Sequence, residues 1–392
     1  MVTWWSMVTR LPMVTRASMV TRASMITRAS MIFLAVLFLF APFKTLHAGQ
    51  NELPKVVILA TGGTIAGSAK SAVDASYDPG TISIHRIIES VPEAAKIASL
   101  QGIQVCNIAS QNIQLSLWLQ LCSMIDSLFV NDVCDGIVIT HGTDTMEETA
   151  YFLNLTVRHK SRVVITGAMR PSTAMSADGP ANLYNAIALA ASEEATGRGV
   201  MVVMNDNIFS ADDVTKTNTL STNAFSSPNL GPLGRMRGGK PEFFRENLKK
   251  HTFKSEFDVI GKETLPKVEI VYGYAFASPV AFRALTDAGV DGIVIAGVGH
   301  GNFGREIATE IAYAKERGVC VVRSSRIVSG GVDTSAEEYD VSTPVAFMNN
   351  PQKARILLML ALSAQKTADK DREPITESNP VLGKIHRIFN EY

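Results

Sequence analysis

The sequence has few cysteines, no long apolar run and no excess of charge of either sign. Its 392 residues include four cysteines without a CxxC pair, which gives no support to a zinc site. The formal net charge is zero and no run rich in Lys and Arg occurs, so the composition gives no indication of a nucleic-acid partner. The sequence also has no GxxxxGK[ST] loop, and hence no phosphate-binding signature of that type.

Three of the four cysteines lie in or beside predicted strands or helices, and we interpret them as small core residues. An oxidising compartment would permit one disulfide, with Cys106, Cys122 and Cys134 as the nearer partners and Cys320 more distant along the chain. The sequence does not choose among these pairings.

The first 48 residues differ in composition from the rest of the chain. A six-residue repeat begins at Met1, and Met25 or Met31 are alternative start positions. Arg28 precedes the apolar stretch 31–43, and Ala48 follows as a small residue at its exit, which is typical of a secretory signal. We therefore predict that residues 1–48 form a repeat-bearing leader and signal peptide, cleaved near Ala48, and that no membrane association remains after cleavage. The apolar stretch is too short to span a bilayer comfortably.

Strand-like and helix-like patterns alternate along the rest of the chain. This alternation predicts an α/β fold, with a larger N-terminal domain (53–242) that has a twisted, parallel-rich sheet flanked by helices. A charged segment without a clear pattern (243–265) fits a linker, and a smaller C-terminal α/β domain (266–392) follows. In the larger domain we expect strands over Lys55–Thr61, Ile103–Ile108, Gly136–Thr140, Arg162–Thr166 and Gly199–Met204, helices over Ser116–Phe129, Thr145–Val157 and Pro180–Glu194, and a hairpin region over Phe209–Arg237.

Polar clusters follow the predicted parallel strands at the points where they end. The carboxyl ends of parallel strands meet at one edge of a sheet, where ligands bind, so these clusters are expected to converge there. The clusters are Thr61-Gly-Gly-Thr64, Ala109-Ser-Gln111, His141-Gly-Thr-Asp144 and Gly167-Ala-Met-Arg170.

Thr64 follows two glycines at a strand tip and is a candidate nucleophile. The alternative is a tight turn with a structural threonine. A threonine hydroxyl needs a base, and the candidates are Tyr77 and Lys216, either of which would need a lowered pKa. Lys216 could equally be a solvated surface cation.

Thr143 and Asp144 place a second hydroxyl beside a carboxylate at a neighbouring strand tip. With Ser110 and Gln111, Asp144 could bind a small zwitterion, because a carboxylate takes an ammonium while hydroxyl, amide and backbone N–H groups take a carboxylate. These residue types serve equally well in ordinary capping of the following helix.

A possible dinucleotide motif, GxGxxG, occurs over residues 299–304. The strand after it ends in Arg323-Ser-Ser325, without the acidic residue that should hold the ribose hydroxyls. Nucleotide binding is therefore the weaker interpretation of this stretch.

The chain resembles the bacterial type II (periplasmic) L-asparaginases and their glutaminase-asparaginase relatives. The resemblance extends from about Leu53 to the carboxyl terminus. It is carried by Ile58-Leu-Ala-Thr-Gly-Gly-Thr-Ile-Ala66, Gly136-Ile-Val-Ile-Thr-His-Gly-Thr-Asp-Thr-Met146, Gly167-Ala-Met-Arg-Pro-Ser172, Met175-Ser-Ala-Asp-Gly-Pro180, Asp213-Val-Thr-Lys-Thr-Asn218, Gly297-Val-Gly299 and Asn350-Pro-Gln-Lys-Ala-Arg355.

The resemblance implies hydrolysis of L-asparagine to L-aspartate and ammonia, without a metal or other cofactor, in a periplasmic homotetramer. Broad activity on L-glutamine is the alternative, since the two substrates differ by one methylene. Covalent attack and direct attack by water both stay open. The implied nucleophile is Thr64, supported by a second triad of Thr143, Asp144 and Lys216, with Tyr77 on a mobile loop.

The resemblance also assigns the substrate-binding positions. Ser110, Gln111 and Asp144 match the positions that bind the amino-acid head group, and backbone N–H groups near Thr143 and Ala168 would stabilise the oxyanion. A neighbouring subunit would contribute an acid and one further residue to each site. The positions that match are Glu337, with Glu338 as the alternative, and His300, where the family pattern leads us to expect Asn or Ser.

Overall fold

The computed structural model describes residues 52–68, 71, 80–335, 343–363 and 373–392. The predicted leader therefore lies outside the described residues. Leu53–Tyr392 groups into one compact unit. Within it, the described strands form an eight-stranded sheet, a three-stranded sheet and a two-stranded ribbon.

The large sheet is parallel at its centre and antiparallel at one end. Its strand order is β10-β9-β6-β5-β4-β3-β1-β2, and β2, β1, β3, β4 and β5 are mutually parallel. The apolar runs form the central strands because parallel strands are covered on both faces. The sheet strands are β1 (Lys55–Gly62), β2 (Ser99–Ile108), β3 (Gly136–Thr140), β4 (Arg162–Thr166), β5 (Val200–Met204), β6 (Asn207–Ser210), β9 (Gly234–Arg237) and β10 (Lys240–Phe243).

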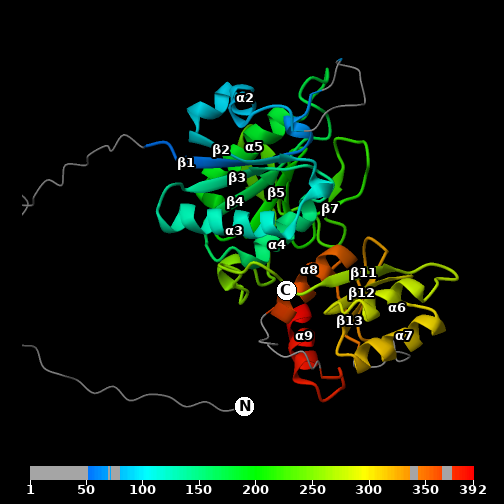
Figure 1. Cartoon of the computed structure of the whole chain (residues 1–392). Coiled ribbons are helices and arrows are strands. Elements are labelled where there is room, and N and C mark those ends of the chain that lie inside the picture. Colours follow the sequence, from blue (N-terminus) through cyan, green and yellow to red (C-terminus); the bar gives the residue numbers. More distant parts are fainter. Residues whose placement is uncertain (1–51, 69–70, 72–79, 336–342, 364–372) are drawn as a thin grey trace, which may run out of the picture. The chain divides into compact units, whose positions relative to one another are not determined.

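Helices cover both faces of this sheet, with α2 and α5 on one face and α3 and α4 on the other (Figure 1). Alternate residues of β1 enter different cores, since successive side chains of a strand point to opposite faces. Val56 and Ile58 pack with residues of α5, while Val57 and Leu59 pack with residues of α3 and α4. The helices are α2 (Ile84–Glu89), α3 (Leu115–Val130), α4 (Met146–Thr156) and α5 (Gly179–Ala191).

The small sheet is parallel, with the order β11-β12-β13. Its helices α6 and α7 pack against one face, and α8 packs against the other and continues into the core around α4. The predicted α/β architecture, with a larger parallel-rich sheet and a smaller parallel one, is confirmed. The elements are β11 (Val268–Tyr272), α6 (Val280–Asp287), β12 (Gly292–Gly297), α7 (Arg305–Glu316), β13 (Cys320–Ser325), α8 (Pro351–Ser363) and α9 (Pro380–Glu391).

The segment that joins the two sheets, interpreted above as a linker, packs against the protein. Phe257 and Val259 are buried in the same core as α4, and the Ser255 hydroxyl donates a hydrogen bond to the Leu155 carbonyl at 2.5 Å. The connection is irregular in structure but anchored by apolar contacts.

All four cysteines lie in the described part of the chain, and all four are free thiols. Cys122, Cys134 and Cys320 are buried, and burial raises the pKa of the first two to about 11. The thiols are therefore poor nucleophiles at neutral pH. The disulfide that the sequence left open is not formed in this structure.

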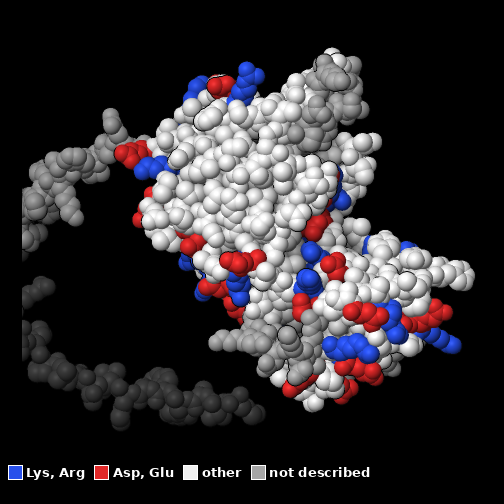
Figure 2. Space-filling model, in the orientation of Figure 1, with Lys and Arg blue, Asp and Glu red and all other residues white. Residues whose placement is uncertain are grey.

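Acidic and basic side chains are interspersed over the face of the molecule drawn in Figure 2. Both signs occur side by side around the small sheet, and a broad area over the large sheet carries little charge. Of the helices in the described ranges, none combines the length and apolar composition needed to cross a bilayer.

Candidate active site

A cavity of about 240 Å³ opens at the carboxyl ends of β1, β2 and β3. These strands are neighbours in the sheet, with β1 in the middle. The predicted convergence of the polar clusters at one sheet edge is confirmed. Three of the four loops line this cavity, and the fourth follows β4, the parallel neighbour of β3, and brings Gly167 close to Thr143. The lining residues are Gly63, Thr64, Ala109, Ser110, Gln111, Gly142, Thr143 and Asp144.

Two glycines bring the tips of β1 and β3 into backbone contact. Gly63 has φ 78°, and a Cβ at this position would overlap the Cα and N of Gly142. A Cβ on Gly142 would in turn lie 2.8 Å from the Ser110 hydroxyl oxygen. The absence of side chains at both positions therefore lets the three loops close around one small volume.

Thr64 begins a single turn of 3-10 helix, Thr64–Ala66, directly after Gly63. The residue is 6% exposed, and its carbonyl accepts a hydrogen bond from the Gly67 N–H at 2.8 Å. Thr143, across the cavity on the loop after β3, is 5% exposed. Two nearly buried hydroxyl-bearing residues thus line the same cavity.

Lys216 lies with Thr143 and Asp144. Its Nζ donates to the Thr143 hydroxyl oxygen at 2.9 Å and to an Asp144 carboxylate oxygen at 2.6 Å. The Lys216 side chain is 17% exposed, whereas that of Asp144 is 61% exposed. A solvated surface lysine does not fit this burial and these two bonds. The Thr143 hydroxyl oxygen accepts a hydrogen bond from the Lys216 ammonium. The Thr143 hydroxyl can therefore donate its own proton to a different partner.

Ser110 and Gln111 begin a short 3-10 turn, Ser110–Asn112, at the end of β2. The Ser110 carbonyl accepts a hydrogen bond from the Thr145 hydroxyl at 2.8 Å, which ties this turn to the loop after β3. Ser110 is 4% exposed, while Gln111 is exposed at the rim. Both residues line the cavity that Thr64, Thr143 and Asp144 line.

The structure places the other predicted site residues elsewhere or does not describe them. Ala168 is fully buried on the loop after β4 and does not line the cavity; its neighbour Gly167 is the residue of this loop that approaches Thr143. His300 lies in the turn after β12, where its Nε2 accepts the Asp333 N–H at 3.2 Å. Tyr77 and Glu337, with its alternative Glu338, lie outside the described residues.

A buried histidine fixes the loop that carries Thr143. His141 is fully buried, its Nδ1–H donates to the Gly142 carbonyl at 2.6 Å, and its Nε2 lies 2.8 Å from the Thr149 hydroxyl. Thr149 also accepts the indole N–H of Trp118 at 2.8 Å. In the neutral imidazole, which burial favours, Nε2 accepts the proton that Thr149 donates. Burial lowers the pKa of His141 from 6.5 to about 4.

We expect the protein to lose stability as the pH falls from 6.5 to about 4. The unfolded chain binds a proton at residue 141 in this window and the folded chain does not, so His141 alone should lower the unfolding free energy by on the order of 3 kcal/mol. Urea unfolding at several pH values, compared with His141→Gln, tests this. The variant should show a shallower pH dependence, although burial also lowers the pKa of His251, which both proteins retain. Equal slopes would contradict the assignment.

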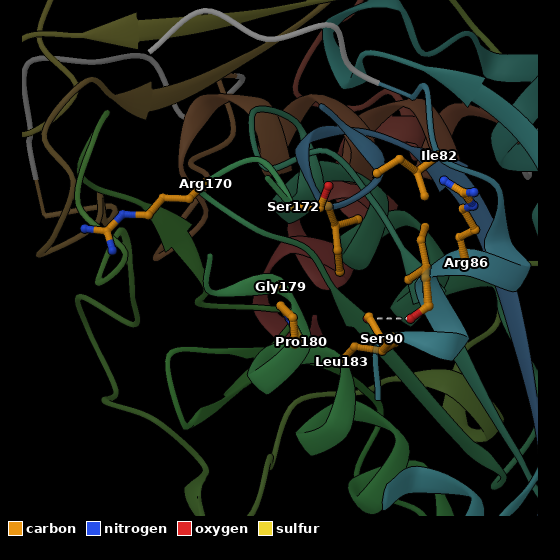
Figure 3. Close-up of a pocket in the computed structure, with 10 residues that line it drawn as sticks. Ile82, Arg86, Ser90, Arg170, Ser172, Gly179, Pro180 and Leu183 are labelled. Carbon is orange, nitrogen blue, oxygen red and sulfur yellow. Dashed lines mark hydrogen bonds between the residues drawn. The ribbon is translucent and has the colours of Figure 1, made fainter. Parts of the chain in front are cut away.

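A second cavity, of about 200 Å³, lies between α2 and α5 (Figure 3). Its walls are largely aliphatic, and its two serine hydroxyls already donate to backbone carbonyls, Ser90 to Ile87 at 2.6 Å and Ser172 to Gly67 at 2.8 Å. Arg170 points away from the other lining side chains in Figure 3. This cavity lacks the converging polar groups that a zwitterion needs.

The chemistry available at the site is that of hydroxyl, carboxylate and amine groups. Over the described residues, no group of three or more His, Cys, Asp and Glu side chains could hold a metal ion. Two nearly buried hydroxyls, one of them bonded to a lysine, and an exposed carboxylate suit acyl transfer from a small amide that carries an ammonium group.

Comparison with known proteins agrees with this arrangement. Residues 55–249 match the family model "Asparaginase, N-terminal", and residues 267–373 match "Glutaminase/Asparaginase C-terminal domain". The chain is 48% identical to L-asparaginase 2 of Escherichia coli, over 87% of this chain and 94% of that protein. It is 47% identical to a glutaminase-asparaginase of Pseudomonas fluorescens, over 92% and 97%.

A solved structure is also similar. The crystal structure of a probable cytoplasmic L-asparaginase from Campylobacter jejuni has a TM-score of 0.80 and 45% sequence identity. The similarity covers 86% of this chain and all of that one. The two family models together match well over half of the chain, and the chain therefore belongs to the asparaginase family.

Proposed function

We propose that this protein hydrolyses the side-chain amide of L-asparagine to give L-aspartate and ammonia. One observation carries the proposal: Lys216 Nζ contacts both Thr143 and Asp144 at a cavity that Thr64 also lines. Membership of the asparaginase family supports the same reaction. The relative named glutaminase-asparaginase makes activity on L-glutamine the second candidate.

In the proposed mechanism, the Thr64 hydroxyl oxygen attacks the amide carbon of the substrate. Its proton passes through the group of Thr143 and Lys216 to the amide nitrogen, the carbon–nitrogen bond breaks, and ammonia leaves. Backbone N–H groups near Thr143 and Ala168 stabilise the oxyanion. Water then hydrolyses the threonine ester, which releases aspartate and restores the hydroxyl.

The substrate head group binds on the β2 and β3 side of the cavity. The side chain of Asp144 is largely exposed. One carboxylate oxygen binds Lys216, and the carboxylate also binds the α-ammonium group of the substrate. Ser110 and Gln111 bind the α-carboxylate. Tyr77 closes over the substrate. Glu337 and His300 complete the site of a neighbouring subunit, so the active protein is a homotetramer. Sedimentation analysis would detect this assembly as four times the mass of one chain.

We further propose that the protein is exported to the periplasm and cleaved near Ala48. The support is the order of Arg28, the apolar stretch 31–43 and the small residue Ala48. The mature chain would then begin at Gly49 on amino-terminal sequencing. A chain that retains residues 1–48 after export would contradict the cleavage site.

Steady-state ammonia release from asparagine and from glutamine, measured on the purified protein, tests the function. We expect kcat/KM for asparagine to exceed that for glutamine by about 10-fold or more, because one methylene in a pocket is worth about 1–3 kcal/mol. Excess chelator should leave the rate unchanged. Equal values would assign the broader glutaminase-asparaginase activity, and release from neither substrate would refute the proposal.

A further inference from the structure

The lysine at the candidate active site lies on a very short element. Lys216 belongs to β7 (Thr215–Lys216), which pairs only with β8 (Phe225–Ser226). A two-stranded ribbon of two residues per strand is not stable by itself in water. The position of the Lys216 ammonium must therefore be set by contacts outside this ribbon.

One of these contacts comes from the first turn of α4. The side chain of Glu147 directs one carboxylate oxygen, Oε2, at the backbone N–H of Lys216, at 2.8 Å. The other oxygen, Oε1, accepts hydrogen bonds from the side-chain amides of Gln352 and, at 3.4 Å, of Asn350. Glu147 is 5% exposed, so these bonds form away from water, where they are stronger.

The start of α8 supplies further contacts to the same backbone. The Asn350 side-chain amide also donates to the Thr215 hydroxyl at 3.3 Å, and its oxygen accepts the Lys353 N–H at 3.0 Å. The Lys353 ammonium, 1% exposed, donates to the carbonyls of Asp212 at 3.0 Å and Val214 at 2.6 Å. The Lys216 N–H and residues that precede it in the chain are thus bonded to α4 or to the start of α8.

Lys353 places a buried cation near the Glu147 carboxylate. Burial lowers the pKa of Lys353, and the nearby carboxylate of Glu147 acts on it in the opposite direction. A buried carboxylate is costly unless it is hydrogen-bonded and accompanied by a cation, and both conditions are met here.

We propose that Glu147 is a positioning residue that sets the Lys216 ammonium against Thr143 and Asp144 by holding the Lys216 backbone. Asn350 and Gln352 orient Glu147 from α8. Glu147 has no contact with the substrate in this scheme and acts only through Lys216. The inference rests on the proposed function, since it concerns the amide hydrolysis assigned to the same site.

A double-mutant cycle with Glu147→Ala and Lys216→Ala, followed by ammonia release, tests this. In the wild-type background, Glu147→Ala should lower kcat by about 10- to 100-fold with little change in KM, because misplacement of a catalytic group by about 1 Å has effects of this size. In the Lys216→Ala background the same change should alter kcat by less than about twofold, since residues that act through one group are not additive.

Two further variants complete the design. Glu148→Gln alters the neighbouring carboxylate of α4 and should leave kcat unchanged, because the Lys216 N–H donates to Glu147 and not to Glu148. Glu147→Gln should restore most of kcat, because one amide oxygen can still accept the Lys216 N–H while Gln352 rotates its own amide to match. If Glu147→Ala does not fold, Gln352→Ala, which removes a hydrogen bond to Glu147, carries the same cycle with a smaller expected loss.

The outcomes separate this inference from the proposed function. A wild-type protein without activity on either amide would contradict the proposed function. An active wild type in which Glu147→Ala keeps its kcat, or loses equal factors in both backgrounds, would contradict only the positioning role.

Discussion

Thr64→Ala is expected to lower ammonia release from asparagine by roughly 10³-fold or more while the fold is retained. The change removes the hydroxyl that we propose forms the ester, and no other described residue of the cavity offers a hydroxyl in the same position at the tip of β1. The methyl side chain fits the same nearly buried space, so the structure around it should not change. Steady-state kinetics and circular dichroism measure the two effects.

Matched variants sharpen this test. Thr64→Ser keeps a hydroxyl and should keep a measurable part of kcat. Thr61→Ala removes a hydroxyl from the same strand, but the Thr61 hydroxyl donates to the Thr140 carbonyl at 2.8 Å and does not line the cavity, so this change should cost stability rather than rate. Direct attack by water, with Thr64 only polarising the amide, would leave Thr64→Ala at about one thousandth to one hundredth of the wild-type kcat, and no threonine ester would form in either protein.

Gly63→Ala adds one methyl group at the candidate active site, and we expect it to lower both stability and activity strongly. The residue has φ 78°, which costs an L-residue about 1–2 kcal/mol, and its Cβ would overlap the backbone of Gly142. Overpacking against backbone adds about 1–3 kcal/mol, so we expect a loss of about 2–5 kcal/mol in unfolding free energy and almost complete loss of activity.

Gly231→Ala provides the control for Gly63→Ala. Gly231 has φ 72°, close to that of Gly63, but a Cβ there would meet nothing within 4 Å. The control should therefore show the conformational cost alone, about 1–2 kcal/mol, and retain activity. If the two variants unfold at the same urea concentration, the contact between the tips of β1 and β3 does not matter for stability.

The sequence predicted the central strands of the large sheet well because their signal is local. Residues of β1, β3 and β4 form continuous apolar runs, and their predicted bounds differ little from those observed. The edge strand β2 begins at Ser99, four residues before the predicted start, because an edge strand is only partly buried and its apolar pattern is weak. The six-residue helix α2 was missed for a similar reason, since so short a helix leaves little periodicity.

The polar residues at the strand tips were also accessible to sequence reasoning. Thr64, Ser110, Gln111, Thr143 and Asp144 follow strands whose order and direction could be predicted, and all five line one cavity. From the residues alone, Lys216 was either a candidate base or a surface cation, because it lies on a two-residue strand without a pattern of its own. The family motif favoured the first interpretation.

Glu147 lies in the first turn of the predicted helix Thr145–Val157, and the sequence alone does not assign it to the site. Its partners Asn350 and Gln352 lie more than 200 positions away in the chain, at 203 and 205 residues. Local sequence periodicity cannot predict such contacts, since they depend on how α8 packs against α4. In the sequence, the only indication that Asn350 and Gln352 matter is that they lie in the stretch Asn350–Arg355, which resembles the asparaginase family.

The same long separation matters during synthesis. As the polypeptide leaves the ribosome from its amino end, the strands that bear both threonines are complete roughly 200 residues before α8 has been made. Until then the Lys216 segment lacks the side chains of Asn350, Gln352 and Lys353 that hold it in the finished protein. A nascent chain therefore contains both hydroxyls well before it contains the side chains that fix the lysine.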